Sequence, residues 1–130
     1  MNTQPLILIV EDSPTQAQQL AAILGDYALR ISLATDGLEA INMVDSLRPD
    51  LIILDVTLPR MDGYQVCSRL KRDTNNAHIP VIMLTSIDSA DGTLHGLEVG
   101  ADDYIAKDSF MTENLLATLD SFLNIFADGQ

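Results

Sequence analysis

The sequence predicts a doubly wound α/β fold, in which a five-stranded parallel sheet is covered on both faces by five helices. Five short, continuous apolar runs indicate strands that are buried on both faces. The segments between the runs leave room for a helix, which a connection between parallel strands requires. This alternation of strands and helices along the chain is typical of a parallel sheet.

The predicted strands are short, and the third of them ends in a carboxylate. Four apolar residues, Leu51–Leu54, lead directly into Asp55, where a turn residue is expected. The five runs are Leu6–Val10, Leu29–Ala34, Leu51–Leu54, Val81–Thr85 and Asp103–Ala106.

Helix signals follow four of the five strands. Ser13 before Pro14 is typical of a helix N-terminus, and Gly25 of a C-terminus. Pro49 stops the second helix. The apolar side chains at helical spacing in the second, third and last helices are Leu38, Ile41, Val44, Leu47, Val66, Cys67, Leu70, Leu115, Leu116, Leu119, Phe122, Leu123 and Phe126.

The remaining helix is predicted in the segment 88–100, and we expect it to be the least stable of the five. It contains Gly92 and Gly96. Each glycine in a helix interior costs about 1 kcal/mol relative to alanine.

Length and composition limit the classes of function. A chain of 130 residues predicts a single domain, 1–130, with an ordered core at about 5–126. The net charge of -12 repels phosphate backbones, so we expect no direct nucleic-acid binding and favour a cationic partner or a divalent metal. Cys67 is the single cysteine, no secretory signal is evident, and no apolar run approaches the ~20 residues of a membrane span. We therefore predict a cytoplasmic protein that does not cross a membrane.

Polar residues stand at the ends of the predicted strands, where ligands bind in doubly wound sheets. Glu11 and Asp12 follow the first strand, Asp55 the third and Lys107 the fifth, while Thr85 ends the fourth. Three carboxylates on one edge repel one another unless a cation lies among them. Oxygen ligands without histidine or cysteine favour a hard ion such as Mg²⁺.

A carboxylate in this setting predicts chemistry at phosphorus. Asp55 can attack a phosphoryl group and form an acyl phosphate. Because both reactants are anionic, the attack needs positive charge, which Mg²⁺ and Lys107 would supply. Taken singly, each acidic residue has a simpler interpretation as a helix cap, and Tyr104 as a half-buried strand aromatic.

These residues resemble the receiver domains of bacterial two-component response regulators, the CheY-like family, over nearly the whole chain. The acidic pair, the phosphoacceptor aspartate, the switch threonine and the lysine of that family fall on residues already named. Two further runs match the family pattern, namely Asp55, Leu58, Pro59, Met61, Asp62 and Gly63, and Gly100–Tyr104.

The resemblance implies the strand order 2-1-3-4-5 and a signalling mechanism. Asp55 would take a phosphoryl group from the phosphohistidine of a histidine kinase or phosphotransfer protein. Mg²⁺ would be held by Asp12, Asp55 and the backbone carbonyl of Thr57, with Glu11 acting through water. The protein would thus be regulatory rather than an enzyme with a substrate of its own.

The same resemblance implies a switch. Thr85 would turn toward the phosphoryl group and Tyr104 would turn inward. The face made by the fourth helix, fifth strand and fifth helix would then control a downstream partner, a fused output domain or a homodimer.

One position departs from the family pattern. The family lysine is usually followed by a cis-proline, whereas Lys107 precedes Asp108. A cis bond before a non-proline residue costs about 2.5–4 kcal/mol, so we expect a strained or a trans loop. Asp108 also favours an alternative, a pseudo-receiver that binds partners without being phosphorylated.

Two other classes of protein fit less well. A phosphatase of the haloacid dehalogenase type needs an aspartate as general acid two residues after the nucleophile, where this chain has Thr57. In a flavodoxin-like cofactor binder, Glu11 and Asp12 would repel the phosphate. We expect no functional role for His78 and His95, which we predict to be exposed, or for Cys67, which we predict to be buried.

Overall fold

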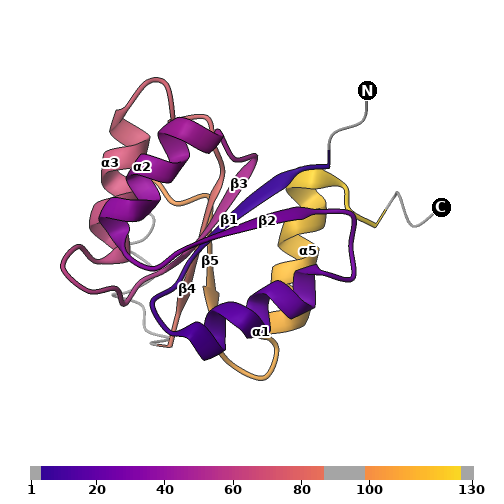
Figure 1. Ribbon diagram of the computed structural model, residues 1–130. Coiled ribbons are helices and arrows are strands. Elements are labelled where there is room, and N and C mark those ends of the chain that lie inside the picture. The colour runs from indigo at the N-terminus through magenta and orange to yellow at the C-terminus, as the bar shows by residue number, and fades with distance from the viewer. Residues whose placement is uncertain (1–3, 87–98, 127–130) are drawn as a thin grey trace.

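The computed structural model describes residues 4–86 and 99–126 and contains one five-stranded parallel sheet (Figure 1). The strand order is β2-β1-β3-β4-β5, as the family resemblance implied. The strands are β1 (Leu6–Val10), β2 (Arg30–Ala34), β3 (Leu51–Asp55), β4 (Val81–Thr85) and β5 (Asp103–Ala106).

Helices cover both faces of the sheet, and in residues 4–86 and 99–126 two helices lie on each side (Figure 1). Within the described ranges they are α1 (Pro14–Leu24), α2 (Gly37–Leu47), α3 (Gly63–Arg72) and α5 (Met111–Leu123). The helix predicted in the segment 88–100 falls almost entirely outside the described residues, so a total of five helices stays a prediction. None of the helices described here has the length and apolar character needed to cross a membrane.

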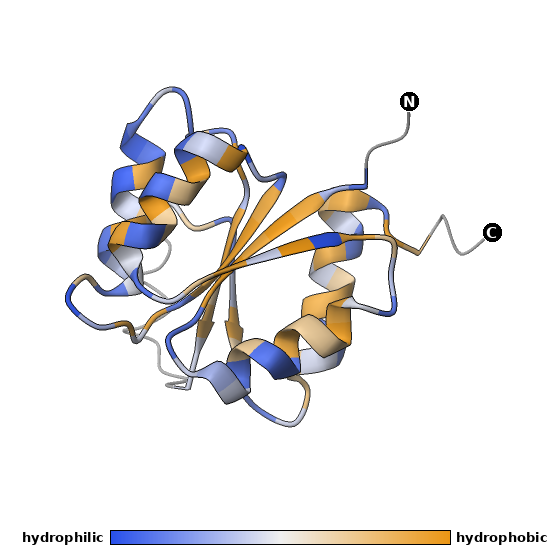
Figure 2. Ribbon diagram, in the orientation of Figure 1, coloured by the Kyte–Doolittle hydropathy of each residue, from blue (hydrophilic) through white to orange (hydrophobic). Residues whose placement is uncertain are grey.

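The three central strands, β1, β3 and β4, are almost entirely apolar and buried because each of their faces contributes to a separate core. The edge strands β2 and β5 are only partly buried, so the prediction of burial on both faces was wrong for them. On β1, Leu8 and Val10 pack with α2 and α3, whereas Ile7 and Ile9 pack with α1 and α5. Figure 2 shows this arrangement as apolar strands between helices that turn polar residues outward. Successive residues of a strand point to opposite faces, so a strand buried on both faces cannot alternate with polar residues.

Side-chain caps define the helix starts that lead away from the sheet edge. The Ser13 hydroxyl accepts a hydrogen bond from the Gln16 N–H, which confirms the predicted start of α1. Asp62 and Gln65 form a reciprocal capping box at the start of α3. These local bonds set the direction in which each helix leaves the strand end.

The C-terminal helix is shorter than its apolar pattern predicts. It ends at Leu123, because Asn124 adopts a left-handed backbone conformation with φ 57°. Phe122 is 42% exposed and Phe126 is 50% exposed, although both belong to the apolar pattern predicted for this helix. The Phe126 ring instead lies beside Tyr27, with ring centroids 5.8 Å apart. β2 also begins one residue later than predicted, at Arg30.

Gly63 allows α3 to begin directly against the end of β3. Its N–H donates to the carbonyl of Val56 at 2.8 Å. A Cβ atom at this position would lie 2.3 Å from the carbonyl oxygen of Asp55 and 2.8 Å from the Cα of Val56. Because both neighbours are backbone atoms, they cannot move aside without displacing the strand end.

We predict that Gly63→Ala lowers the free energy of unfolding by about 3 kcal/mol, since the new methyl group would overlap the β3 backbone. Urea unfolding followed by circular dichroism measures this change. Gly25→Ala is the matched control, because Gly25 has φ −65° and a Cβ there would meet Ala21 oxygen at 3.2 Å. The control should change stability by less than about 1 kcal/mol. Equal effects of the two substitutions would contradict the close approach.

Candidate functional site

Strand register brings two carboxylates side by side at the carboxyl edge of the sheet. Val10 of β1 pairs with Leu54 of β3, so the next residues, Glu11 and Asp55, are neighbours. Both are buried, at 3% and 6% exposure, while Asp12 is exposed. One carboxylate oxygen from each of Glu11, Asp12 and Asp55 lies within 4.8 Å of the others. The predicted convergence of these three residues is thus present.

Lys107 reaches the same place from the end of β5. Its Nζ donates to Asp55 Oδ2 at 3.0 Å and to Glu11 Oε1 at 3.2 Å. Its backbone N–H donates to the Thr85 carbonyl at 2.7 Å, which continues the pairing of β5 with β4. The ammonium group therefore offsets negative charge on the two buried carboxylates.

Gln16 is a part of this cluster that the sequence did not reveal. Its Oε1 accepts a hydrogen bond from Lys107 Nζ at 2.6 Å. Gln16 lies in the first turn of α1, three residues after the cap Ser13. Its position at the helix start was predictable, but glutamine is common on exposed helix faces and carries no signal of this contact. It acts on the site through Lys107.

The carboxylate of Asp55 is also held by backbone. The N–H of Thr57 donates to Asp55 Oδ1 at 3.2 Å. A cavity of about 240 Å³ opens here, and Ser86, Lys107 and the three acidic residues are among those that line it. Thr57 is exposed, and Thr85 is buried at 2% exposure on the neighbouring strand β4. The predicted residues Glu11, Asp12, Asp55, Thr57, Thr85 and Lys107 therefore gather at one edge.

Burial and charge act together on Glu11. Loss of water is the largest effect and raises the pKa of its carboxyl group, and the neighbouring Asp55 raises it further. The Ser13 N–H and Lys107 lower this pKa, but the net result is an increase above the ordinary value of 4.5. The increase means that the ionised form of Glu11 is disfavoured beside Asp55. A bound cation would remove that penalty.

The departure at Asp108 is accommodated by a trans bond. All described peptide bonds are trans, including Lys107–Asp108, so the trans alternative is the one adopted. The Asp108 carboxylate accepts a hydrogen bond from the Phe110 N–H at 2.8 Å. Asp108 thus helps to form the turn into α5, while Lys107 still contacts Asp55.

Tyr104 is joined to a second tyrosine that the sequence did not single out. Its hydroxyl lies 3.0 Å from the hydroxyl of Tyr64, in the second position of α3. Burial, followed by the hydrogen bond with Tyr104, raises the pKa of Tyr64. Both rings pack against the core formed with α2 and α3. The structure therefore links the proposed switch residue to α3.

The remaining predictions concern the burial or exposure of single residues outside the site. Cys67 is fully buried, and burial raises the pKa of its thiol to about 11, so it is not poised for reaction. His78 is exposed, as predicted. His95 lies outside the described residues.

The fold and the site define a class of protein: a doubly wound α/β protein with an acidic, oxygen-only site at the carboxyl edge of its parallel sheet. The family model of the response regulator receiver domain matches residues 7–120. The chain therefore belongs to the response regulator receiver domains.

Curated relatives and solved structures agree with this assignment. The chain is 39% identical over 119 residues to the DNA-binding dual master transcriptional regulator RpaA of Synechocystis sp.. The aligned residues are 92% of this chain and 49% of RpaA. The chain thus spans about half the length of the curated relatives it matches.

Two solved structures bear on the fold and on the metal. The signal receiver domain of a histidine kinase from Syntrophus aciditrophicus is 41% identical, with a TM-score of 0.85 and coverage of 92% of this chain and 90% of that one. The Mn²⁺-bound form of the response regulator Rcp1 is 26% identical, with a TM-score of 0.77 and coverage of 91% and 93%.

The donor set fits a hard divalent cation. Carboxylate oxygens from Glu11, Asp12 and Asp55 lie close enough together to share an ion. Receiver domains bind Mg²⁺ in an acidic pocket of this kind, and Mg²⁺ prefers a few carboxylates completed by water and phosphate. The residues present therefore suit the metal of the family.

We predict that Glu11→Gln stabilises the metal-free protein at neutral pH. The folded protein holds the Glu11 proton more tightly than the unfolded chain, so stability falls as pH rises from 4.5 through the raised pKa. The variant lacks this loss, so its advantage should grow with pH. Urea unfolding with a chelator, across pH 4 to pH 7, measures it.

Two controls make the measurement specific. Glu113→Gln removes an exposed carboxylate from the first turn of α5 and should show no growing advantage. Added Mg²⁺ should restore the wild type relative to Glu11→Gln, since the cation offsets the charge of Glu11. If the free energy of unfolding changed with pH in the same way for the wild type and Glu11→Gln, the raised pKa of Glu11 would be contradicted.

Proposed function

We propose that Asp55 is the phosphoacceptor of a two-component phosphorelay and that its phosphorylation controls a protein partner. One observation carries the proposal: the buried Asp55 carboxylate accepts hydrogen bonds from Lys107 Nζ at 3.0 Å and from the Thr57 N–H at 3.2 Å, beside two further carboxylates. This combination supplies a nucleophile, a fixed orientation and balancing charge at one point.

The reaction is a phosphoryl transfer from the phosphohistidine of a histidine kinase or phosphotransfer protein. An oxygen of Asp55 attacks the phosphorus atom, the P–N bond of the donor breaks, and the imidazole nitrogen keeps the electron pair and takes up a proton. The product is an acyl phosphate on Asp55. Lys107 Nζ already donates to Asp55 Oδ2, so it can donate to a phosphoryl oxygen and offset its charge once the phosphoryl group is bound there.

The metal would be Mg²⁺, held by Asp12, Asp55 and the backbone carbonyl of Thr57, with Glu11 acting through water. When bound, it neutralises charge on the attacking and transferring oxygens. The closeness of the three carboxylates and the Mn²⁺-bound form of the relative Rcp1 support this assignment. Thr57 in place of an aspartate leaves the haloacid dehalogenase mechanism without its acid.

The output would follow from Thr85 and Tyr104. Thr85 ends β4 beside Asp55, and its carbonyl accepts the Lys107 N–H, which supports a role in sensing the phosphoryl group. Tyr104 lies on β5, next to that strand. We propose that their movement alters the face of the fourth helix, β5 and α5, which then binds a partner, an output domain or a second copy.

The protein as a whole would be regulatory. We propose that 1–130 forms one cytoplasmic receiver domain, and that any contact with nucleic acid is made by another domain or protein rather than by this acidic one. The pseudo-receiver, which signals without phosphorylation, is the competing function. Asp108 no longer favours it, because its carboxylate turns to the Phe110 N–H while Lys107 keeps its contact with Asp55.

The first test is phosphorylation by acetyl phosphate with Mg²⁺, read as intact mass. We expect the gain of one phosphoryl group in the wild type and none in Asp55→Asn or in a chelator-treated sample. Asp62→Asn is the matched control, because Asp62 is an exposed cap of α3, and it should still be phosphorylated. No gain in a wild-type protein that binds Mg²⁺ would favour the pseudo-receiver.

A second prediction compares the role of Lys107 with that of Gln16, which contacts it. Lys107→Ala should slow phosphorylation by acetyl phosphate about 10²-fold, since it removes the cation that faces the transferring group. Gln16→Ala should slow it by less than about tenfold, because Gln16 only orients Lys107. Initial rates from mass spectra measure both. A larger loss in Gln16→Ala than in Lys107→Ala would contradict these roles.

A further inference from the structure

The positive charge of this acidic chain gathers on one helix. The chain has seven lysines and arginines against nineteen acidic residues. Arg69, Lys71 and Arg72 all lie in the last turn of α3, which contains no acidic residue, and Arg60 lies in the loop before it. The last turns of α1, α2 and α5 hold no basic residue. Among the helices of residues 4–86 and 99–126, α3 is therefore the one with a basic last turn.

Two of these cations are used within the fold. Lys71 Nζ bonds to Asp102 Oδ2 at 2.8 Å and to the carbonyls of Ala77 and Ile79. Arg60 pairs with Asp36 at 2.9 Å. Their positions are explained by these internal contacts.

Arg69 and Arg72 have no such explanation. Arg72 donates to the hydroxyl of Ser68, one turn earlier on the same helix, at 3.1 Å from Nε. Arg69 is exposed and makes no hydrogen bond or ion pair with any residue in 4–86 or 99–126. A basic last turn favours the helix dipole, but that role needs no particular surroundings.

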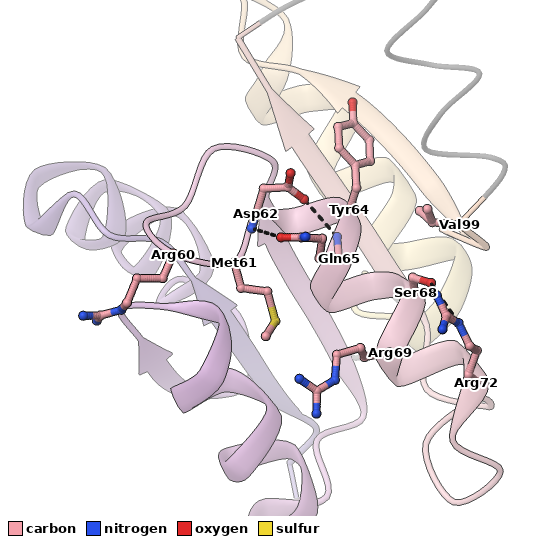
Figure 3. Close-up of a pocket in the computed structure, with 9 residues that line it drawn as sticks. All are labelled: Arg60, Met61, Asp62, Tyr64, Gln65, Ser68, Arg69, Arg72 and Val99. Atoms are coloured by element: carbon pink, nitrogen blue, oxygen red, sulfur yellow. Dashed lines mark hydrogen bonds between the residues drawn. The ribbon is translucent and has the colours of Figure 1, made fainter.

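The surroundings are a cavity of about 670 Å³ on the outer side of α3, here called the α3 cavity. Figure 3 shows Arg69 reaching out from the helix below the Met61 side chain, and Arg72 folded against Ser68. The lining combines these guanidinium groups with apolar and aromatic surface and with one carboxylate, Asp62, which accepts the Gln65 N–H as the cap of α3. It includes Met61, Tyr64, Ser68, Arg69, Arg72 and Val99.

We propose that the α3 cavity binds an acidic segment of a partner protein, with carboxylates on Arg69 and Arg72 and an apolar side chain against Met61. A guanidinium group matches a carboxylate with two parallel hydrogen bonds, and its weak hydration lowers the cost of the contact. The cavity has the size of a site for a few side chains. The apolar part of the lining favours a peptide over a simple anion.

The charge of the whole chain selects the class of ligand. A nucleic-acid backbone extends far beyond two arginines and would meet the field of a protein with net charge -12. A short segment with two or three carboxylates can place its charge on α3 alone. The inference is independent of phosphorylation at Asp55, because the cavity lies on α3 and contains none of the acidic residues of that site.

Tyr64 provides an internal reporter of binding. It lines the α3 cavity, and its hydroxyl lies 3.0 Å from that of Tyr104 on β5. A ligand beside Tyr64 should therefore shift the nuclear magnetic resonance signals of Tyr104 as well as those of Arg69. The third tyrosine, Tyr27, packs against Phe126 and should be unaffected.

The test uses the unphosphorylated protein and two pools of fluorescein-labelled nonapeptides. One pool alternates glutamate or aspartate with leucine or phenylalanine, and the other replaces each acid by its amide. We expect the acidic pool alone to raise fluorescence anisotropy at micromolar protein, with weaker binding at higher salt. Arg69→Gln should weaken it about tenfold. Arg30→Gln, an exposed arginine on β2, is the matched control and should bind like the wild type.

Several results would overturn the proposal. Equal binding of both pools, unchanged binding in Arg69→Gln, or no binding of the acidic pool up to millimolar protein would each do so. Tighter binding of a single-stranded oligonucleotide would assign the α3 cavity to nucleic acid. Self-association that Arg69→Gln abolishes, without peptide binding, would assign it to a second copy of the chain. Thermal unfolding of both variants shows whether any loss reflects folding.

Discussion

Repulsion among carboxylates at the end of β1 and β3 is the constraint on which the rest of this structure depends. The parallel register sets Glu11 beside Asp55, and the fold buries both. Such a pair is unfavourable unless positive charge approaches it. Lys107 is supplied from the far strand β5, ninety-six residues along the chain from Glu11. The site therefore forms only when the whole sheet is assembled, which ties its chemistry to global folding.

The packing around β3 holds the Asp55 carboxylate in place at the end of the strand. The strand is apolar up to Leu54, because two helical layers cover its two faces. Gly63 then lets α3 start against the strand backbone, so the loop that carries Thr57 is short and closely held. A carboxylate on a rigid strand end, with its orientation fixed by a backbone N–H, is better prepared for reaction than one on a mobile loop.

Two groups of charged residues stand out in the described part of the chain. The acidic patch lies at the carboxyl edge of the sheet, and the basic one lies on the outer side of α3. Tyr64 and Tyr104 join α3 to β5 by a hydrogen bond across the core. This contact ties the helix that carries the basic side chains to β5, the strand whose end is followed by Lys107.

The sequence by itself determined the elements and the candidate site, because both depend on local patterns and on one rule of topology. Apolar runs and caps placed the strands and most helix starts, and parallel strands bring their carboxyl ends to one edge. Only the tertiary structure decided that Gln16 supports Lys107, that Tyr64 holds Tyr104, and that Phe122 faces outward. These facts depend on side-chain directions between elements far apart in the chain, which local periodicity does not encode.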